Sequence, residues 1–365
     1  MPMKRVSTCL LLLVSLCITR ICLASPTVEV KDLAGRQVRV PVDPDRIACI
    51  GPGTLRLVVY LQAQMKVSGV EDMEKRRSDG RPYWIAHPEL SRLPCCGPGG
   101  PASINKKPDL EALLSVRPQL ILVTYMEKAL ADEVQRTLGI PVVVLSYGEL
   151  GTFSEEIYKS LRIVGRILKR GERASEVIGY TEKLRRDLQA RTRDIPGDSR
   201  PAAYVGGIGY RGTHGIESSE HEYMPLDWVG ARNLAKKVEA GIGSHVMVGK
   251  ELLLKLNPGV IFIDGGGLEL VAEDVRRKPE YYNVLSAFEK KRVYTLLPFN
   301  WYATNVCTAL ADAYAIGKIL YPHRFEDIDP EKKADQIYTF LVGKPVYEEM
   351  KAIYGPLGQK APFLD

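Results

Sequence analysis

A long helical stretch in the middle of the chain constrains the fold more than any other feature. Residues 154–192 contain no proline, and charged residues alternate there with apolar ones. Apolar residues recur at three- and four-residue steps and so share one face of a helix: Ile157, Leu161, Val164 and Leu168. Gly171 interrupts the pattern before a similar stripe resumes, so we predict two helices, over 154–169 and 172–192.

The chain on either side of this stretch carries the same pattern twice. In the first half, Glu111 opens a helical segment, Pro118 follows seven residues later, and an apolar strand comes next. In the second half, Glu251 and Pro258 have the same spacing and again precede a strand. Strands that alternate with helices indicate parallel sheets, and a repeated unit indicates two related lobes. We therefore predict an α/β fold of two Rossmann-like lobes bridged by a long helical linker.

The N-terminal residues 1–24 are typical of a secretory signal peptide. Lys4 and Arg5 precede the apolar run Leu10–Cys17, which is too short to span a bilayer. The residues before Cys22 do not match a lipoprotein site, so we expect a periplasmic protein released by cleavage before Ser25. The predicted boundaries are a signal peptide at 1–24, an N-terminal lobe at 26–152, bridging helices at 153–194, a C-terminal lobe at 195–328, and a helical tail packed on the outside at 329–365.

Charge and cysteine content exclude several classes of protein. The formal charge of +6 falls to +3 without the leader's three cations, which is too weak and too evenly spread for a nucleic-acid partner. No Cys-x-x-Cys pair occurs, which argues against a zinc or iron–sulfur site. Adjacent cysteines bond each other only with strain, but the disulfide state stays open for the cysteines that remain after cleavage: Cys49, Cys95, Cys96 and Cys307.

Ligands of parallel sheets bind outside the carboxyl ends of the strands. The predicted strand tips therefore supply a candidate lining for a cleft between the lobes: Tyr125, Glu127 and Tyr147 from the first lobe, and Tyr210, Arg211, His214, Trp301 and Tyr302 from the second. Phenols, an imidazole and a guanidinium suit a ligand that is partly aromatic and partly anionic, or one that carries an oxophilic metal. Whether the protein ligates a metal directly stays open.

Each of these residues also has a purely structural interpretation. His214 could simply face solvent, Arg211 could be a solvated charge, and Trp301 and Tyr302 could pack the lobes together. A long loop over residues 76–100 carries Tyr83 and Trp84, which suit either a small local core or ligand contact. The chain has no nucleophile-elbow, zincin or phosphate-loop motif, so we expect no catalytic activity and no intrinsic cofactor.

Taken together, these features resemble the periplasmic binding proteins of ABC importers for iron–siderophore complexes, haem and cobalamin. The resemblance covers roughly residues 28–325. Beyond the leader and the helical bridge, it is carried by Asp32-Leu-Ala-Gly-Arg-Gln-Val38, Pro44-Asp-Arg-Ile47, Lys107-Pro-Asp-Leu-Glu111 and Arg117-Pro-Gln-Leu-Ile121. The chain departs from the family pattern in the long 76–100 loop and at Lys250, where the family has leucine.

The resemblance implies a monomeric receptor that holds a metal complex between two lobes and delivers it to an ABC permease and its ATPase. It also implies that Glu111 and Glu251 dock onto arginines of the permease. Some members of the family bind molybdate or tungstate, and Arg211 with His214 suits an oxyanion as well. A secreted two-lobed enzyme acting on a metal or tetrapyrrole is the alternative from another class, although no catalytic motif supports it.

Overall fold

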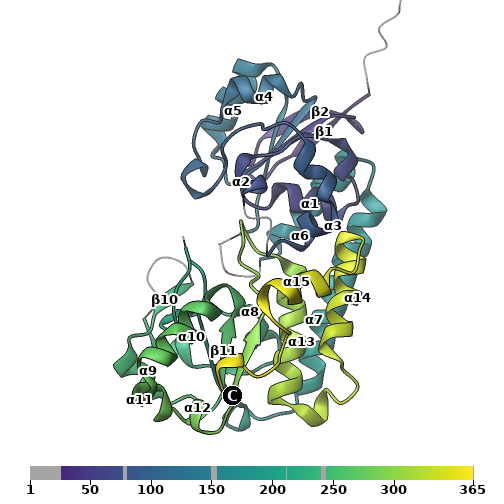
Figure 1. The fold of residues 1–365 in the computed structure, drawn as a ribbon. Helices are drawn as coiled ribbons and strands as arrows, with labels where there is room; N and C mark the ends of the chain where they lie inside the picture. Colours follow the sequence, from purple (N-terminus) through teal and green to yellow (C-terminus); the bar gives the residue numbers. More distant parts are fainter. Residues whose placement is uncertain (1–25, 77–79, 149–153, 211, 240–243, 365) are drawn as a thin grey trace, which may run out of the picture.

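The computed structural model describes residues 26–76, 80–148, 154–210, 212–239 and 244–364. The predicted signal peptide and Arg211 lie outside the described residues. Figure 1 shows two lobes, one above the other, joined along one side by helices. The predicted fold class is confirmed. No helix among the described residues is long and apolar enough to cross a membrane.

The N-terminal lobe consists of a hairpin followed by a parallel sheet. β1 (Thr27–Lys31) pairs antiparallel with β2 (Gln37–Pro41). The sheet has the order β4-β3-β5-β6. Its strands are β3 (Ile47–Ile50), β4 (Val67–Gly69), β5 (Leu120–Thr124) and β6 (Val142–Leu145). Every residue of β5 and β6 is buried, as expected for strands covered on both faces. The helices of this lobe are α1 (Thr54–Tyr60), α2 (Asp72–Lys75), α3 (Pro82–Ala86), α4 (Leu110–Ser115) and α5 (Lys128–Leu138).

The C-terminal lobe repeats this topology. Its sheet has the order β12-β11-β7-β9. Read from β9 to β12, its four strands have the same spatial order as those of the N-terminal sheet: second, first, third and fourth in the chain. The strands are β7 (Ala202–Gly206), β9 (Arg232–Asn233), β11 (Ile261–Asp264) and β12 (Val293–Leu296). A short antiparallel pair, β8 (Ser218–Glu220) and β10 (His245–Met247), is added to the repeat. The helices are α8 (Met224–Trp228), α9 (Lys250–Leu256), α10 (Leu268–Arg277), α11 (Pro279–Asn283), α12 (Ser286–Glu289) and α13 (Val306–Leu320).

The linker is the pair of helices that the apolar stripe predicted, α6 (Glu156–Ile167) and α7 (Gly171–Thr192). The stripe residues Ile157, Leu161 and Val164 are all buried. α7 packs against α13 and α8 of the C-terminal lobe, whereas α6 packs against α1 and β1 of the N-terminal lobe. The linker is therefore anchored in both lobes by its apolar face.

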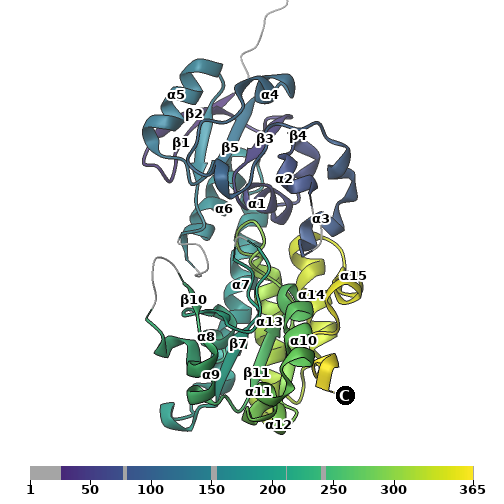
Figure 2. The ribbon, with the colours of Figure 1, turned by 60° about the vertical axis from the view of Figure 1, so that its left-hand side comes forward.

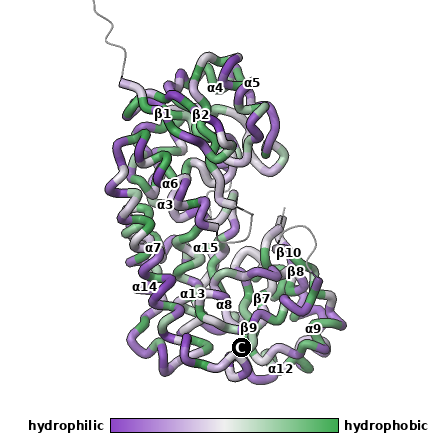
Figure 3. The backbone as a smooth tube through the Cα atoms, turned by 180° about the vertical axis from the view of Figure 1, so that it is seen from behind, coloured by the Kyte–Doolittle hydropathy of each residue, from purple (hydrophilic) through white to green (hydrophobic). Residues whose placement is uncertain are grey.

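The C-terminal tail packs against both lobes and not on one of them alone. α14 (Pro330–Val342) contacts α13 below and α1 and α3 above, and α15 (Tyr347–Tyr354) follows it. Ile337, Tyr338 and Leu341 of α14 are fully buried, and they belong to one apolar cluster that extends from the N-terminal lobe through the linker. Figures 1 and 3 place α7, α13 and α14 together along one side of the molecule. The tail is thus a second connection between the lobes.

Candidate functional site

Two histidines and a tyrosine come together on the C-terminal lobe. The Tyr210 ring stacks on His245, with ring centroids 4.2 Å apart and an interplanar angle of 10°, and the His214 ring lies 6.0 Å from His245. Figures 1 and 2 place β10, which carries His245, at the end of this lobe nearest the N-terminal lobe. Tyr210 is 44% exposed. We call Tyr210, His214 and His245 the imidazole cluster.

The hydrogen bonds of the imidazole cluster fix which ring nitrogens are free. His214 Nε2 lies 2.7 Å from the Tyr210 carbonyl oxygen, which only accepts, so Nε2 carries the proton. The Ser218 hydroxyl donates to the Ile208 carbonyl, so its 2.9 Å contact with His245 Nε2 requires the imidazole to donate. In the neutral form each ring would therefore keep a lone pair on Nδ1, and addition of a proton would convert Nδ1 into a donor.

His245 was missed by the sequence analysis, because it is a lone histidine in a strand of three residues after a long loop. Only its pairing with β8 brings it next to Tyr210 and Ser218. Partial burial, together with the neighbouring His214, lowers the pKa of His245 below its ordinary value. The neutral form of the His245 imidazole is therefore the main form at pH 7.

The two tyrosines of the N-terminal lobe that were predicted to line the ligand cleft are less exposed than such a role requires. Tyr147 is buried, and its hydroxyl donates to the Gly53 carbonyl at 2.8 Å. Tyr125 is half-buried, and it adopts a left-handed backbone conformation with φ 57° at the tip of β5. Such a conformation costs a bulky residue on the order of 1–3 kcal/mol and is common at functional sites. Glu127 lies two residues further on, directly before α5, and is exposed.

The loop that follows β12 connects the two lobes through hydrogen bonds. The Tyr302 hydroxyl donates to Glu71 of the N-terminal lobe at 2.5 Å and accepts from the Gly100 amide at 3.0 Å. Tyr302 is only 7% exposed, so in this conformation it packs the lobes rather than lining an open site. Its neighbour Trp301 is half-buried against Gly80, where a Cβ atom would lie 2.5 Å from the indole ring.

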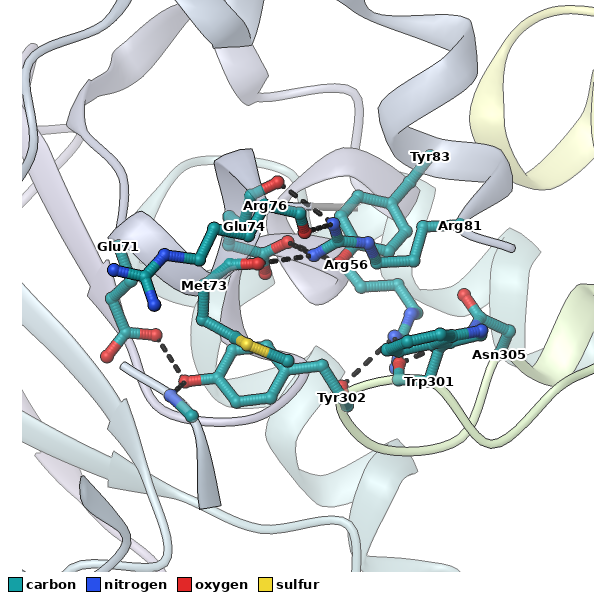
Figure 4. A network of polar contacts seen from close by, with 11 residues as sticks. Arg56, Glu71, Met73, Glu74, Arg76, Arg81, Tyr83, Trp301, Tyr302 and Asn305 are labelled. Atoms are coloured by element: carbon teal, nitrogen blue, oxygen red, sulfur yellow. Dashed lines mark hydrogen bonds and ion pairs between the residues drawn. The ribbon is translucent and has the colours of Figure 1, made fainter. Parts of the chain in front are cut away.

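Arg56 strengthens this contact between the lobes, as Figure 4 shows. Its guanidinium is fully buried and donates to the carbonyls of Trp301 at 2.7 Å, Tyr302 at 3.1 Å and Thr304 at 2.9 Å. The Tyr83 ring lies 4.9 Å from the guanidinium carbon. These contacts cross from α1 to the opposite lobe, so they fix the spacing of the lobes from inside.

The described part of the segment predicted as a long loop, residues 80–100, contains α3 and is part of this packing. Arg81 forms a buried ion pair with Glu74 at 2.7 Å, and the Tyr83 hydroxyl donates to the same carboxylate oxygen at 2.7 Å (Figure 4). His87 Nε2 lies 2.8 Å from the Val342 carbonyl oxygen at the end of α14. Tyr83 and Trp84 are buried, so of the two interpretations the structure supports the local core.

Three carboxylic acids and a phenol are buried beneath the strand tips of the C-terminal lobe. Glu220 accepts from the Asn300 amide at 2.6 Å, Asp264 from the Gly266 amide at 2.8 Å, and Asp312 from the Leu297 amide at 3.1 Å. The second oxygens of Glu220 and Asp312 and the hydroxyl of the phenol, Tyr223, have no hydrogen-bond partner among the residues that the structure describes.

Burial raises the pKa of these acids. It raises the pKa of Glu220 to about 8, helped by the nearby Asp264 and opposed by Asn300. It raises the pKa of Asp264 to about 7 and that of Asp312 well above its ordinary value. On the other lobe, burial likewise raises the pKa of Glu71 to about 7, against the hydrogen bonds from Tyr302 and Gly51. Neutral acids are therefore part of the fold below pH 7.

The N-terminal lobe contains a small cavity, and the described residues contain no metal cluster. A cavity of about 50 Å³ lies in the N-terminal lobe between Glu71, Lys106 and Thr124, with room for a few water molecules only. No group of three His, Cys, Asp or Glu side chains in the described part of the chain is placed to hold a metal ion. The four cysteines in the described part of the chain are all free thiols.

Glu111 and Glu251 lie at equivalent places in the two lobes. Each is exposed in the first turn of its helix, α4 or α9. Neither carboxylate forms an ion pair with another described residue. Figure 1 shows α4 on the upper lobe and α9 on the lower lobe, both away from the side that carries α7.

Comparisons with known proteins agree with this architecture. A family model described as "periplasmic binding protein" matches residues 102–298. The molybdate-binding protein MolA of Haemophilus influenzae is 25% identical over 331 residues, which cover 85% of this chain and 89% of the relative. The structure of MolA bound to molybdate superposes with a TM-score of 0.68 at 22% identity, covering 87% of this chain and 98% of that one.

Other solved structures share the fold at lower identity. A periplasmic solute-binding protein from Veillonella parvula has a TM-score of 0.71 at 19% identity and covers 90% of this chain and 97% of its own. CeuE of Helicobacter pylori with Ni(II) bound has a TM-score of 0.61 at 16% identity and covers 87% and 96%. At these identities the likeness establishes the fold, whereas the ligands named belong to those proteins.

Proposed function

Because the chain belongs to the periplasmic binding protein family, we propose that it captures a small oxyanion of the molybdate or tungstate type and presents it to the permease of an ABC importer. It acts as a receptor and not as a catalyst. The observation that carries the proposal is the imidazole cluster at the end of the C-terminal lobe that faces the other lobe.

The cluster suits an oxyanion because each ring is already held by its Nε2 atom. Protonation of His214 and His245 would add an N–H donor at each Nδ1 without moving either ring. Hydrogen bonds from charged donors to an anion are the strong class. An arriving dianion would favour the protonated form of His245, whose pKa is otherwise lowered by burial. The similarity to a molybdate-binding relative over most of the chain supports this choice of ligand.

A chelated metal ion is the second candidate, in line with the family resemblance to receptors for ferric siderophores, haem and cobalamin. The specific observation in favour of a metal chelate is the tautomer of His214 and His245, in which Nε2 carries the proton. A histidine that ligates a metal typically donates its other ring proton to a carbonyl or hydroxyl group, as His214 and His245 do. Two Nδ1 lone pairs could then complete the coordination of a metal that a small chelator already holds.

The pH dependence of binding separates the two ligands. Oxyanion binding requires protonated imidazoles, so its affinity should rise as the pH falls below the ordinary histidine value of about 6.5. Metal ligation requires neutral imidazoles, so its affinity should fall over the same range. The measurement is isothermal titration calorimetry of the mature protein with molybdate, tungstate, sulfate, nickel–histidine, ferric chelates, haem and cobalamin, at several pH values.

Variants of the cluster complete the test. His214→Ala and His245→Ala should each weaken binding of the preferred ligand by about tenfold or more, the usual loss for one charged hydrogen bond. His323→Ala is the matched control, because that histidine is 92% exposed and distant from the cluster in sequence. Unchanged affinity in both cluster variants, or no binding of any ligand tested, would contradict the proposal.

A further inference from the structure

The outward side of the linker helix α6 is made of cations. The exposed positions of α6 are Lys159, Arg162 and Arg166 alone, and two further exposed cations, Lys169 and Arg170, directly follow the helix. The three positions on α6 lie within about 60° of one another around the helix axis. They lie opposite the apolar face that is buried against the N-terminal lobe. We call the five cations the basic face of α6.

The basic face is not neutralised by neighbouring acids. None of its five side chains forms an ion pair with another residue that the structure describes. The chain has no acid between residues 157 and 171. The carboxylates at its two ends are Glu155 and Glu172, which are exposed, and Glu156, which accepts a hydrogen bond from the Ser146 hydroxyl at 2.6 Å. The positive charge therefore faces solvent uncompensated along the middle of the segment.

This arrangement is unfavourable for the helix by itself. Lys159 and Arg162 are three positions apart, and Arg162 and Arg166 are four apart, so like charges lie side by side and destabilise the helix. Arg173 at the start of α7, by contrast, pairs with Glu176. An anionic partner would remove the repulsion on α6, whereas packing within the chain gives no reason for it.

We propose that the basic face of α6 is a docking surface for the anionic headgroups of a phospholipid membrane. Charge complementarity argues for an anionic surface, because one Lys or Arg close to such a membrane strengthens attachment about fivefold. A specific protein interface would need buried aromatic or apolar anchors. No exposed position of α6 is apolar or aromatic. A surface of charge alone suits a layer of mobile headgroups better than a shaped protein partner.

The inference goes beyond the proposed function and does not depend on the ligand. Attachment through a few exposed cations is weak and reversible, and it falls as salt rises. It would keep a periplasmic receptor close to a membrane surface without fixing it there. The imidazole cluster lies on the other lobe, so the same chain could carry a ligand while α6 rests on the headgroups.

The test is co-sedimentation of the mature protein with vesicles, in the absence of any ligand. One set of vesicles contains phosphatidylglycerol and phosphatidylcholine in equal parts, and the other contains phosphatidylcholine alone. The unaltered protein should bind only the anionic vesicles, and high salt should release it because exposed charges are screened. Lys159→Gln, Arg162→Gln and Arg166→Gln combined should weaken binding to the anionic vesicles by about a hundredfold.

A second triple variant with the same change of net charge is the control. Lys290→Gln, Lys291→Gln and Arg292→Gln remove three exposed cations of the C-terminal lobe, directly after α12. This variant should sediment with anionic vesicles nearly as the unaltered protein does. Circular dichroism should be unchanged in both triple variants.

Three outcomes would overturn the proposal. The first is that the unaltered protein does not bind anionic vesicles. The second is an equal loss of binding in the two triple variants, which would assign the attraction to net charge and not to α6. The third is binding of the protein to polyglutamate in preference to the vesicles, which would make the basic face a site for an acidic protein.

Discussion

At the residue scale, buried acids dominate the chemistry of the C-terminal lobe. Glu220, Asp264 and Asp312 each accept one hydrogen bond from the loop that follows a strand, and together they surround Tyr223. A buried acid with few donors is more stable in its neutral form. The loops that carry the candidate site therefore rest on groups whose charge depends on pH.

The first consequence is that the free energy of unfolding falls as the pH rises. The pKa of Glu220 is about 8 in the folded chain, above the ordinary value, so its contribution is complete below about pH 4 and is lost as the pH rises through 8. Between about pH 5.5 and pH 8 the loss is about 3 kcal/mol for this group alone. Glu220→Gln should flatten this part of the profile. Thermal unfolding at a series of pH values measures it.

An exposed carboxylate of the same lobe provides the control. Glu269 lies in the first turn of α10 and is exposed, so Glu269→Gln should leave the pH profile of the melting temperature unchanged. A Glu220→Gln profile as steep as that of the unaltered protein would show that this carboxyl does not hold its proton in the folded state.

At the element scale, α14 has a larger structural role than its position in the sequence suggests. It lies after the last strand, yet it contacts helices of both lobes. Tyr338 is fully buried, and its hydroxyl lies 3.3 Å from that of Thr308 on α13. The apolar face of α14 therefore completes the core that the linker begins.

Truncation of Tyr338 tests this role. Tyr338→Ala should lower the free energy of unfolding by about 3–5 kcal/mol, because the aromatic ring leaves a cavity in a packed core. Thr339→Ala, a change at the exposed neighbouring position on the same helix, should have an effect within about 0.5 kcal/mol. Denaturant titration followed by circular dichroism measures both variants. Equal stability of the two would mean that α14 is a peripheral element after all.

At the scale of the whole molecule, the distance between the lobes is set at three places. α6 and α7 bridge them on one side, α14 packs against both, and Arg56 with Tyr302 joins their inner faces. A core that is continuous from one lobe to the other leaves little room for a hinge. We therefore expect small relative motion of the lobes on ligand binding.

Arg56→Met tests the inner contact. The variant keeps an apolar chain of similar length but deletes the donors to the carbonyls of Trp301, Tyr302 and Thr304. Buried acceptors without partners are costly, at about 1–3 kcal/mol each, so the segment should loosen. Hydrogen exchange measured by mass spectrometry should be faster over residues 300–305.

Arg46→Met is the matched control for this experiment. Arg46 also donates to a carbonyl, that of Arg117 at 2.8 Å, but both residues belong to the N-terminal lobe. Its loss should leave exchange over residues 300–305 unchanged. Comparable acceleration in both variants would assign the effect to general destabilisation rather than to the contact between the lobes.

The sequence by itself determined the elements and their order. The three- and four-residue steps from Ile157 to Val164 specify a buried helical face, and the apolar runs that became β5 and β11 specify strands covered on both sides. The repeated spacing of Glu111 and Glu251 was enough to predict two similar lobes. These features are local, because the period of apolar residues fixes which face of a helix or strand is buried.

The tertiary structure alone decided which polar side chains stay exposed at the strand ends. Tyr302 and Tyr210 both follow strands, yet the hydroxyl of Tyr302 is bound to Glu71, 231 residues away, while Tyr210 stacks on His245 and stays exposed. A pattern along the chain shows that a side chain is at a strand tip, but its partner comes from another element. The hydrogen bonds and the burial of the side chain depend on that partner. Only the folded structure therefore shows whether such a residue belongs to the candidate site or packs the lobes together.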